Sequence, residues 1–459
     1  MSLRERLTPV RMARVAIVAP DGDALRDVLV QVADDGSVDL DDPVDGQQAA
    51  TGAEAEVRLA MTAPADLDAL ADAGRGDLVA GERELRRRAS GAVRRDGIAA
   101  LAGWCPADAI GPLAARLGPA GGALVPLPAP RGVSPPTMLR SGTRVRRAFA
   151  PLVQAYGTVP YADVDPTVLA GIAYVVMFGM MFADAGHGLV LLAAAALVRA
   201  GRPRRIARLR QAWPFLAGAG LASACFGFLF GEFFGPTGVL PVRWLDPLEE
   251  PVPLLAAGIG LGAVLLAGAY VLGVVNRWRE GTGRLALYAP TGLAGAALFV
   301  GLGLLAAGVY AGAAVAVLVG GGVAFTGLVL AGVGLFVASG GGATGAVETA
   351  IHLVDLVIRL GANVVSFTRL AAFGLTHAAL GGLVWSATTA LWSAGGWSPV
   401  LAVVVLVVGN AVTFGLEALV AGIQALRLEY YELFSRVFAA EGRPFRPWHL
   451  PVVTEEGVS

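Results

Sequence analysis

The sequence predicts an all-α polytopic membrane domain of about eight transmembrane helices, preceded by a small α/β cytoplasmic N-terminal domain. Composition is the first indication, because 55% of the 459 residues are hydrophobic and only 15% are charged. Position is the second, because long apolar runs begin only after residue 165. Runs of about 20 apolar residues are typical of membrane-spanning helices. We therefore predict a reduced cytoplasmic domain with its linker at 1–160 and a membrane domain at 161–459.

The N-terminal part contains short predicted elements. Residues 12–18 have the composition of a short strand, and 25–32 that of a short helix. The acidic stretch 34–48 is predicted to be a loop, whereas 65–102 has a helical composition with clustered charge. A connector rich in proline and glycine, 118–136, then leads to the membrane domain. The first twenty residues lack the apolar region of a signal peptide, so we expect the N-terminus in the cytoplasm.

Eight apolar runs are predicted to cross the membrane. They cover residues 167–183, 187–200, 212–235, 253–276, 288–311, 312–338, 346–393 and 399–437. The first two are short, and an interruption at 184–188 separates them, so they could instead form one kinked helix. The last two are longer than a perpendicular crossing requires, so they are expected to tilt or to project beyond the bilayer.

The distribution of arginine decides between a kinked helix and a hairpin. The loop after the second run carries Arg199, Arg202, Arg204, Arg205, Arg208 and Arg210. Such clusters mark cytoplasmic loops. Since the N-terminal domain is also expected there, two crossings are needed and a hairpin is favoured. The later loops alternate consistently, which places both termini in the cytoplasm.

Charge and cysteine content argue against several classes of protein. The formal net charge is −1, so no basic field indicates a nucleic-acid partner. Cys105 and Cys225 lie far apart, which argues against a disulfide framework or a cysteine metal site. Asp184 and His187, three positions apart, could form a metal or catalytic pair. Too few further ligands accompany them and no HExxH motif is present, so a structural turn is favoured, with no metal and no cofactor.

Polar residues in the run 346–393 fall on one side of the predicted helix. Stepping about 100° per residue from Glu348, six polar side chains lie within roughly 60° of it, and Arg369 lies at about −60°. The six are His352, Asp355, Arg359, Asn363, Ser366 and His377. The final run repeats the pattern over an arc of about 100°. Its members are Asn410, Thr413, Glu417, Gln424, Arg427 and Tyr431.

Charged side chains inside such runs indicate a function. A charge near the bilayer centre costs at least roughly 2.5–3.5 kcal/mol on insertion scales, so it persists where it faces a partner or a water-filled cavity. Two facing polar seams therefore predict an aqueous path for ions. Arg369 cannot be deprotonated, so it cannot relay protons, but it can hold a carboxylate in its charged form. Alternatively, it is a structural arginine paired with Glu417 or Asp355.

The two histidines and Glu232 allow more than one interpretation. His352 and His377 are either members of a proton path or polar groups whose hydrogen bonds the neighbouring backbone satisfies. Glu232 ends the third predicted span and could simply reach the membrane interface.

Four motifs in the membrane part resemble the large membrane subunit of V-type and archaeal A-type ATPases, called subunit a or subunit I. Residues 351–355, 366–370 and 375–378 resemble its seventh helix, where an acidic residue precedes S-Y-x-R-L and L-A-H-A, with Phe367 in place of the usual tyrosine. Residues 177–188 are similar to its F-G-x-M-F-x-D-x-G-H-G motif, which includes Asp184 and His187. Asp165-Pro166-Thr167 resembles its D-P-T, and the segment from Glu417 to Gly442 its eighth helix.

The resemblance implies a non-catalytic stator subunit of a rotary ATPase in the prokaryotic plasma membrane, with ATP hydrolysed on other subunits. Its partners would be the proteolipid (c/K) ring, peripheral and central stalk subunits and the lipid bilayer. Arg369 would face the ring's ion-binding carboxylate, supported by Arg427. Asp355, His377 and Glu417 would line half-channels for an ion, expected to be the proton. Ser366, His352 and Gln424 complete the predicted ion path.

One departure from the family concerns the N-terminal part. The family has two α/β lobes joined by a long coiled coil, whereas about 160 residues precede the membrane here. We therefore expect stalk attachment to be minimal or differently organised. An autonomous secondary transporter or channel is the main alternative function, but it would predict a repeated half with a broken helix, and no such repeat is apparent. A polytopic membrane enzyme using Asp184 and His187 is a third.

Overall fold

The computed structural model describes residues 8–41, 72, 76–130, 132–140, 142–201, 210–281, 283–438 and 441–450. These residues form two compact units, one from Pro9–Arg140 and Gly442–Ser459, the other from Met1–Thr8 and Ser141–Glu441. Parts of three predictions lie outside the described residues: 42–48 of the acidic loop, 65–71 and 73–75 of the helical stretch, and 202–209 of the arginine-rich loop. The boundary after residue 160 stays a prediction.

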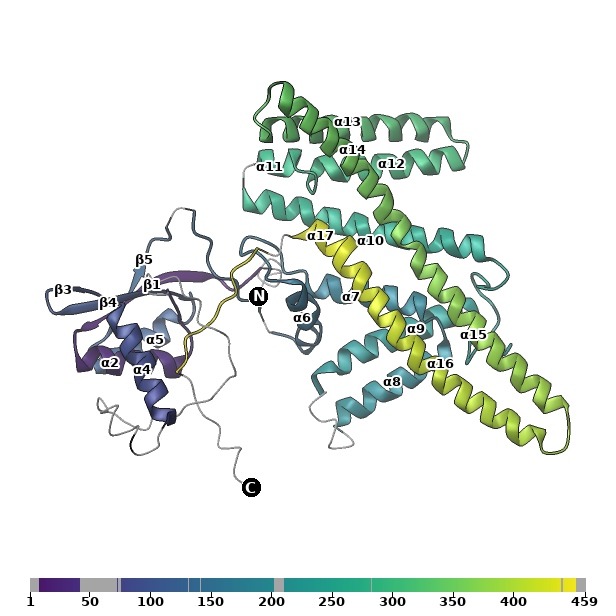
Figure 1. Cartoon of the computed structure of the whole chain (residues 1–459), viewed down its shortest axis with the longest axis horizontal. Coiled ribbons are helices and arrows are strands. Elements are labelled where there is room, and N and C mark those ends of the chain that lie inside the picture. The colour runs from purple at the N-terminus through teal and green to yellow at the C-terminus, as the bar shows by residue number, and fades with distance from the viewer. Residues whose placement is uncertain are drawn as a thin grey trace. The chain divides into compact units, whose positions relative to one another are not determined.

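The first unit is built on an antiparallel sheet (Figure 1). The strands are β1 (Met12–Pro20), β2 (Asp39–Leu40), β3 (Val93–Arg95), β4 (Ile98–Pro106) and β5 (Ala123–Leu127). Their order is β2-β4-β1-β5, and β3 pairs with β4. Within the described part of this unit, three helices accompany the sheet: α2 (Asp23–Asp35), α4 (Gly76–Ser90) and α5 (Ile110–Leu117), which a 3-10 turn, Gly118–Ala120, extends.

The core of this unit joins the sheet to α2. Val15 and Ile17 alternate with less buried residues along β1, as a strand with one covered face requires. Val28 and Val32 of α2 are fully buried in the same cluster. Trp448 also packs there, and its backbone nitrogen donates to Val38 at 2.7 Å. The predicted strand 12–18 and helix 25–32 are therefore confirmed, and a C-terminal segment completes their core.

The predicted helical stretch is wrong after residue 90. α4 ends at Ser90, and β3 and β4 then form a hairpin in which Arg95 faces Ile98. The two residues between them, Asp96 and Gly97, have φ of 52° and 75°. Positive φ at both positions is the geometry of a type I′ turn, which Asp-Gly strongly favours. The Asp96-Gly97 dipeptide could therefore have predicted this hairpin from the sequence alone. β5 likewise lies inside the stretch that was predicted to be a connector.

The Cys105 thiol should resist alkylation in the folded chain. Cys105 is fully buried on β4, and burial, assisted by the nearby charge of Asp108, raises its pKa to about 11. Because only the thiolate reacts, we expect a Cys225→Ser variant to show almost no iodoacetamide labelling at pH 7.5 until it is denatured. Mass spectrometry of labelled peptides measures this, and rapid labelling of the native chain would contradict the packing.

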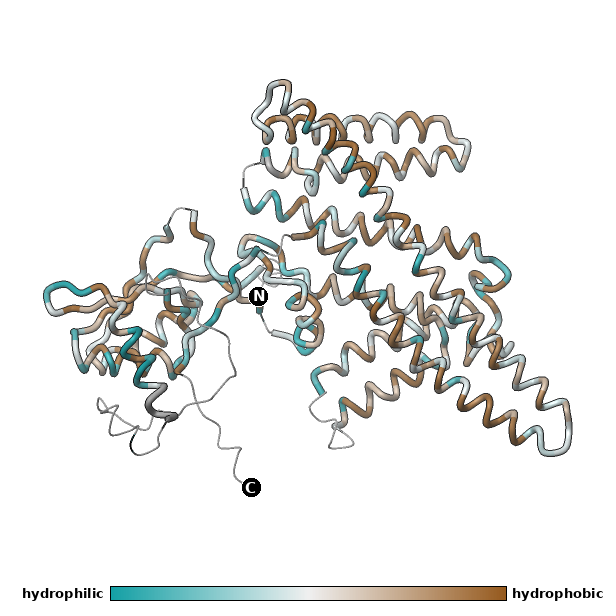
Figure 2. The backbone as a smooth tube through the Cα atoms, in the orientation of Figure 1, coloured by the Kyte–Doolittle hydropathy of each residue, from teal (hydrophilic) through white to brown (hydrophobic). Residues whose placement is uncertain are grey.

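The second unit is helical in its described part. Its helices are α6 (Arg144–Tyr156), α7 (Thr167–Met181), α8 (Ala185–Ala200), α9 (Trp213–Phe230), α10 (Pro251–Glu280), α11 (Gly283–Tyr288), α12 (Leu293–Tyr310), α13 (Ala314–Ala338), α14 (Gly342–Ser366), α15 (Thr368–Ser393) and α16 (Ser398–Leu428), followed by a π-helical turn (Glu429–Phe434) and α17 (Ser435–Val437). Figure 2 shows hydrophobic residues along most of their length.

Six of these helical segments are long and apolar enough to cross a membrane. They include Gly342–Ser393, with 52 residues, and Ser398–Val437, with 40, which match the two long final runs predicted from the sequence. Thr167–Met181 and Ala185–Ala200 are apolar but shorter. A membrane domain with at least six candidate spans is therefore confirmed, whereas the count of eight stays a prediction.

The long run 342–393 is interrupted by a tight turn at Phe367. The backbone nitrogen of Phe367 donates to Val364, and that of Leu370 to Phe367, so the helix tightens locally. The Phe367 side chain is fully buried, and a Cβ at Gly262 of α10 would lie 2.1 Å from its Cγ. The aromatic ring thus fills a place that only glycine leaves open. This turn separates α14 from α15, so a count of about 100° per residue from Glu348 to His377 does not hold across it.

Glycine also allows α8 and α9 to pack closely, and Gly227→Ala should destabilise the unit. The added methyl would lie 2.1 Å from the backbone nitrogen of Ala185. Overpacking of this kind costs about 1–3 kcal/mol, so we expect a lower Tm in detergent. Gly260→Ala on α10 is the matched control, because nothing lies within 4 Å of its Cβ and alanine favours the helix. Equal Tm values for the two variants would contradict this packing.

Candidate functional site

A buried carboxylate, Asp184, ties together the start of α8 and the loop after α9. It is the N-cap of α8 and is fully buried. One oxygen accepts the backbone N–H of His187 and the other that of Gly235, each at 2.8 Å. The predicted structural turn at 184–187 is therefore present, but the carboxylate also holds a segment some fifty residues away. A polar anchor with both oxygens satisfied can persist in an apolar interior.

Two imidazoles lie beside Asp184, and one of them also pairs with a second carboxylate. His377 of α15 is 3% exposed, and its Nε2 lies 3.9 Å from Asp184 Oδ2. Its other ring nitrogen, Nδ1, forms an ion pair with Glu417 of α16. His187 Nδ1 lies 3.9 Å from Asp184 Oδ1. Residues from α8, α15 and α16 thus form one group, which we call the buried cluster: Asp184, His187, His377 and Glu417.

Aromatic rings enclose the buried cluster. Phe182 lies with its ring centroid 5.6 Å from that of His187 and 5.1 Å from that of His377. Phe234 and Phe414 contact His187 at 5.3 and 5.5 Å between ring centroids. These rings limit the water around the charged groups, which strengthens the electrostatic interactions within the cluster.

A cavity of about 620 Å³ opens beside the cluster. Its lining is mainly apolar, with His187, Thr237 and Asn410 as the polar side chains. Asn410 lies on α16, on the polar side predicted from the sequence, and its amide donates to the carbonyl of Leu406. The cavity therefore brings the imidazole of His187 to the wall of an open space.

The buried cluster also has the arrangement of a metal site. Asp184, His187 and His377 can each present one ligand atom, all within 4.8 Å of one another. Two imidazoles and one carboxylate are ligands that zinc accepts. In this arrangement Asp184 already accepts two backbone hydrogen bonds. The expectation from the sequence that no metal binds here stays a prediction.

Arg369 lies in the first turn of α15 and forms no ion pair with a carboxylate of the described residues. Its Nη1 donates to Ser366 Oγ at 2.5 Å, and its side chain is half-buried. The two proposed internal partners are engaged elsewhere: Asp355 with Arg359 at 2.7 Å, and Glu417 with His377. Within the described residues, the structural reading of Arg369 as the partner of Asp355 or Glu417 is therefore wrong.

The polar stripe of α14 faces outward rather than into the buried cluster. Glu348 and His352 are paired at 3.6 Å, and both side chains are 53% exposed. Asp355 and Arg359 form the next pair and are exposed to a similar degree. On α16, Arg427 is exposed and Gln424 is half-buried. The structure thus brings together His377, Glu417, Asp184 and His187, but not Asp355, His352, Arg427 or Gln424.

The sequence analysis did not predict the contacts of two polar residues, Glu232 and Asn363. Glu232 is 3% exposed, because the loop after α9 folds back and its carbonyl accepts the backbone N–H of Ala185 at 2.9 Å. The expectation that it reaches the interface is wrong. Asn363 of α14, with its amide oriented to suit its neighbours, bridges Glu432 and Arg436 at 2.9 and 2.8 Å. Arg436, a second charged residue four positions after Glu432 in the last run, is the feature of the sequence that could have indicated this network.

Breaking the buried ion pair should cost more than breaking an exposed one. We expect Glu417→Ala to lower the free energy of unfolding by about 3–5 kcal/mol, because its partner His377 stays buried without a counter-charge from Glu417. Glu348→Ala is the matched control, since its pair with His352 is exposed and such pairs contribute about 0–1 kcal/mol. Thermal unfolding in detergent measures both variants. A larger loss for Glu348→Ala would contradict the assignment of the cluster.

Comparison with known proteins places this geometry in context. Residues 96–235 match the V-type ATPase 116kDa subunit family. The A-type ATP synthase subunit I of Thermococcus kodakarensis is 29% identical over 325 residues, covering 66% of this chain and 46% of that protein. Subunit I of Aeropyrum pernix is 28% identical over 348 residues, covering 66% and 50%. The V-type ATP synthase subunit I 2 of Treponema pallidum is 33% identical over 171 residues, covering 35% and 36%.

These matches confirm the resemblance inferred from the motifs. The chain spans about half the length of the curated relatives it matches. Together with the six long apolar helices, the comparisons identify a membrane protein similar to subunit I of A-type and V-type ATP synthases.

Proposed function

We propose that this chain, a membrane protein related to the V-type ATPase 116kDa subunit family, is the stator subunit that carries ions past a rotating proteolipid ring. The observation that supports this most is Arg369, a permanent cation in a membrane helix with no carboxylate partner among the described residues. An unpaired charge in a membrane is expensive, so a counter-charge from outside the chain is expected. A carboxylate on a neighbouring ring would provide it.

The proposed mechanism rests on a fixed positive charge. A ring carboxylic acid that reaches Arg369 loses its ion, because an adjacent cation favours the ionised carboxylate. It must bind an ion again before it re-enters lipid, where the ionised form is costly. Ser366 accepts a hydrogen bond from the guanidinium and so limits its orientations. Arg427, which is exposed on α16, would support Arg369.

Two polar routes on either side of Arg369 would serve as half-channels. One runs through the cavity to His187 and the buried cluster, where His377 and Glu417 are already paired. The other follows the exposed stripe of α14, with His352 and Asp355, and Gln424 of α16 contributes a further polar side chain. Each route supplies groups that can exchange a proton, while Arg369 separates them because it does not deprotonate.

The remaining parts of the proposal concern the assembly. The expected partners are the proteolipid ring and the stalk subunits, in a prokaryotic plasma membrane with both termini in the cytoplasm. The chain itself would hydrolyse nothing, because ATP is cleaved on separate soluble subunits. The ion is proposed to be the proton. The division into 1–160 and 161–459 remains part of this proposal.

Replacing Arg369 tests the proposal. In the assembled complex, we expect Arg369→Gln to reduce ATP-driven ion uptake into vesicles to background, because no fixed charge discharges the ring carboxylate. Arg243→Gln is the matched control, since Arg243 lies over Phe228 and outside both proposed routes, and it should pump normally. Co-purification of the other subunits confirms assembly. Pumping by Arg369→Gln at the normal rate, or transport by the purified chain alone in liposomes, would refute the proposal.

A further inference from the structure

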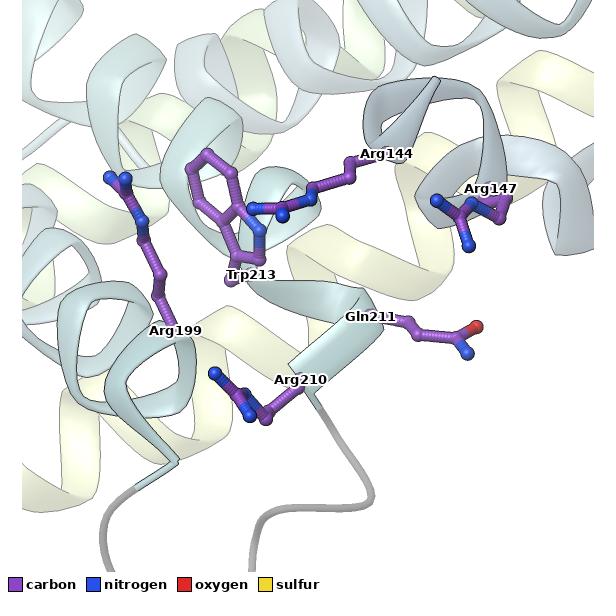
Figure 3. Close-up of a pocket in the computed structure, with 6 residues that line it drawn as sticks. All are labelled: Arg144, Arg147, Arg199, Arg210, Gln211 and Trp213. Carbon is purple, nitrogen blue, oxygen red and sulfur yellow. The ribbon is translucent and has the colours of Figure 1, made fainter. Parts of the chain in front are cut away.

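A second cavity, of about 340 Å³, lies between α6 and the ends of α8 and α9 that face each other. It is lined by Arg144 and Arg147 of α6, Arg199 of α8, Arg210 and Gln211 before α9, and Trp213 (Figure 3). All of its charged lining residues are arginines. Figure 3 shows the side chain of Arg144 extending toward Trp213 and that of Arg199 running alongside it. We call it the arginine cavity.

The arginines of this cavity are not neutralised by described residues of the chain. Arg146, on the same helix as Arg144 and Arg147, shows the contrast, because it pairs with Asp165 at 3.2 Å. No carboxylate among the described residues pairs with Arg144, Arg147, Arg199 or Arg210. Like charges gathered at one cavity repel one another, and a bound anion would relieve this repulsion. Guanidinium groups bind phosphate oxygens by paired hydrogen bonds.

An apolar groove of about 490 Å³ adjoins the arginine cavity. Its lining includes Leu192, Ala195, Ala196, Ala200 and Ala217, from α8 and α9. Arg199 and Trp213 line both spaces, and the Arg199 guanidinium lies 5.0 Å from the centre of the Trp213 ring. A polar, cationic space and an apolar space therefore meet at this pair. Free phosphate would occupy only the first of them.

We propose that the arginine cavity and the apolar groove together bind an anionic phospholipid, with its phosphate among the arginines and an acyl chain along α8 and α9. Basic pockets between membrane helices on the cytoplasmic side suit anionic head groups. Tryptophan is enriched at the level of the membrane interface, where the head group lies. The arginine pattern of the sequence also assigns this end of α8 to the cytoplasmic side. This lipid site goes beyond the proposed ion path and requires none of its residues.

Lipid titration of the purified full chain tests the proposal. Native mass spectrometry in detergent counts bound dioleoylphosphatidylglycerol, with dioleoylphosphatidylcholine and inorganic phosphate titrated in parallel. We expect the phosphatidylglycerol to bind at least about 10-fold more tightly than phosphatidylcholine, since only its head group carries net negative charge. Arg199→Gln and Arg210→Gln should each weaken its binding about 10-fold.

Two further variants separate the head-group and acyl contributions. Ala196→Phe fills the groove and should weaken phosphatidylglycerol binding, while a soluble head-group analogue, glycerol phosphate, binds as before. Arg243→Gln, which also removes an arginine stacked on an aromatic ring, should change neither. Equal affinity for the two lipids, or unchanged binding by Arg199→Gln and Arg210→Gln, would overturn the proposal. Displacement of the lipid by an equal concentration of inorganic phosphate would show that the site takes free phosphate instead.

Discussion

The carboxylate of Asp184 is the interaction on which the rest of the membrane unit depends. It holds the first turn of α8, the loop after α9 and the imidazole of His377 in one place. Burying a charge is costly unless its hydrogen bonds are satisfied, and here two backbone N–H groups satisfy it. Gly227 allows α9 to pack directly against the backbone of Asp184 and Ala185. The hydrogen-bonded turn at Asp184 and the packing of α8 against α9 therefore stabilise each other.

Charge neutralisation divides the polar residues of this unit into two sets. Inside, Glu417 and His377 neutralise each other in an enclosure of aromatic rings. At the surface, Arg369 and the four arginines of the arginine cavity, Arg144, Arg147, Arg199 and Arg210, have no carboxylate partners among the described residues. Cations without a counter-charge beside a membrane are expected to bind anions from other molecules. We therefore propose a protein carboxylate as the partner of Arg369 and a lipid phosphate as the occupant of the arginine cavity.

The sequence predicted much of the candidate site but not its grouping. Angular counting treated 346–393 as one helix and placed His377 on the same side as Asp355. A tight turn at Phe367 interrupts the α-helical repeat between these residues, and His377 enters the buried cluster while Asp355 stays outside it, paired with Arg359. Asp184 and His187 were assigned to a turn, because nothing in local spacing indicates that α15 and α16 pass beside it.

By itself the sequence determined the membrane character of the chain, the two long final helices, the first strand and helix of the N-terminal unit, and the motifs of the family. These follow from apolar run length, short-range periodicity and local residue patterns. Only the tertiary structure decided which charges are paired, since that depends on contacts between helices distant in the chain. It placed Glu417 against His377 and left Arg369 without a carboxylate among the described residues, because side-chain direction is fixed by packing rather than by position in the sequence.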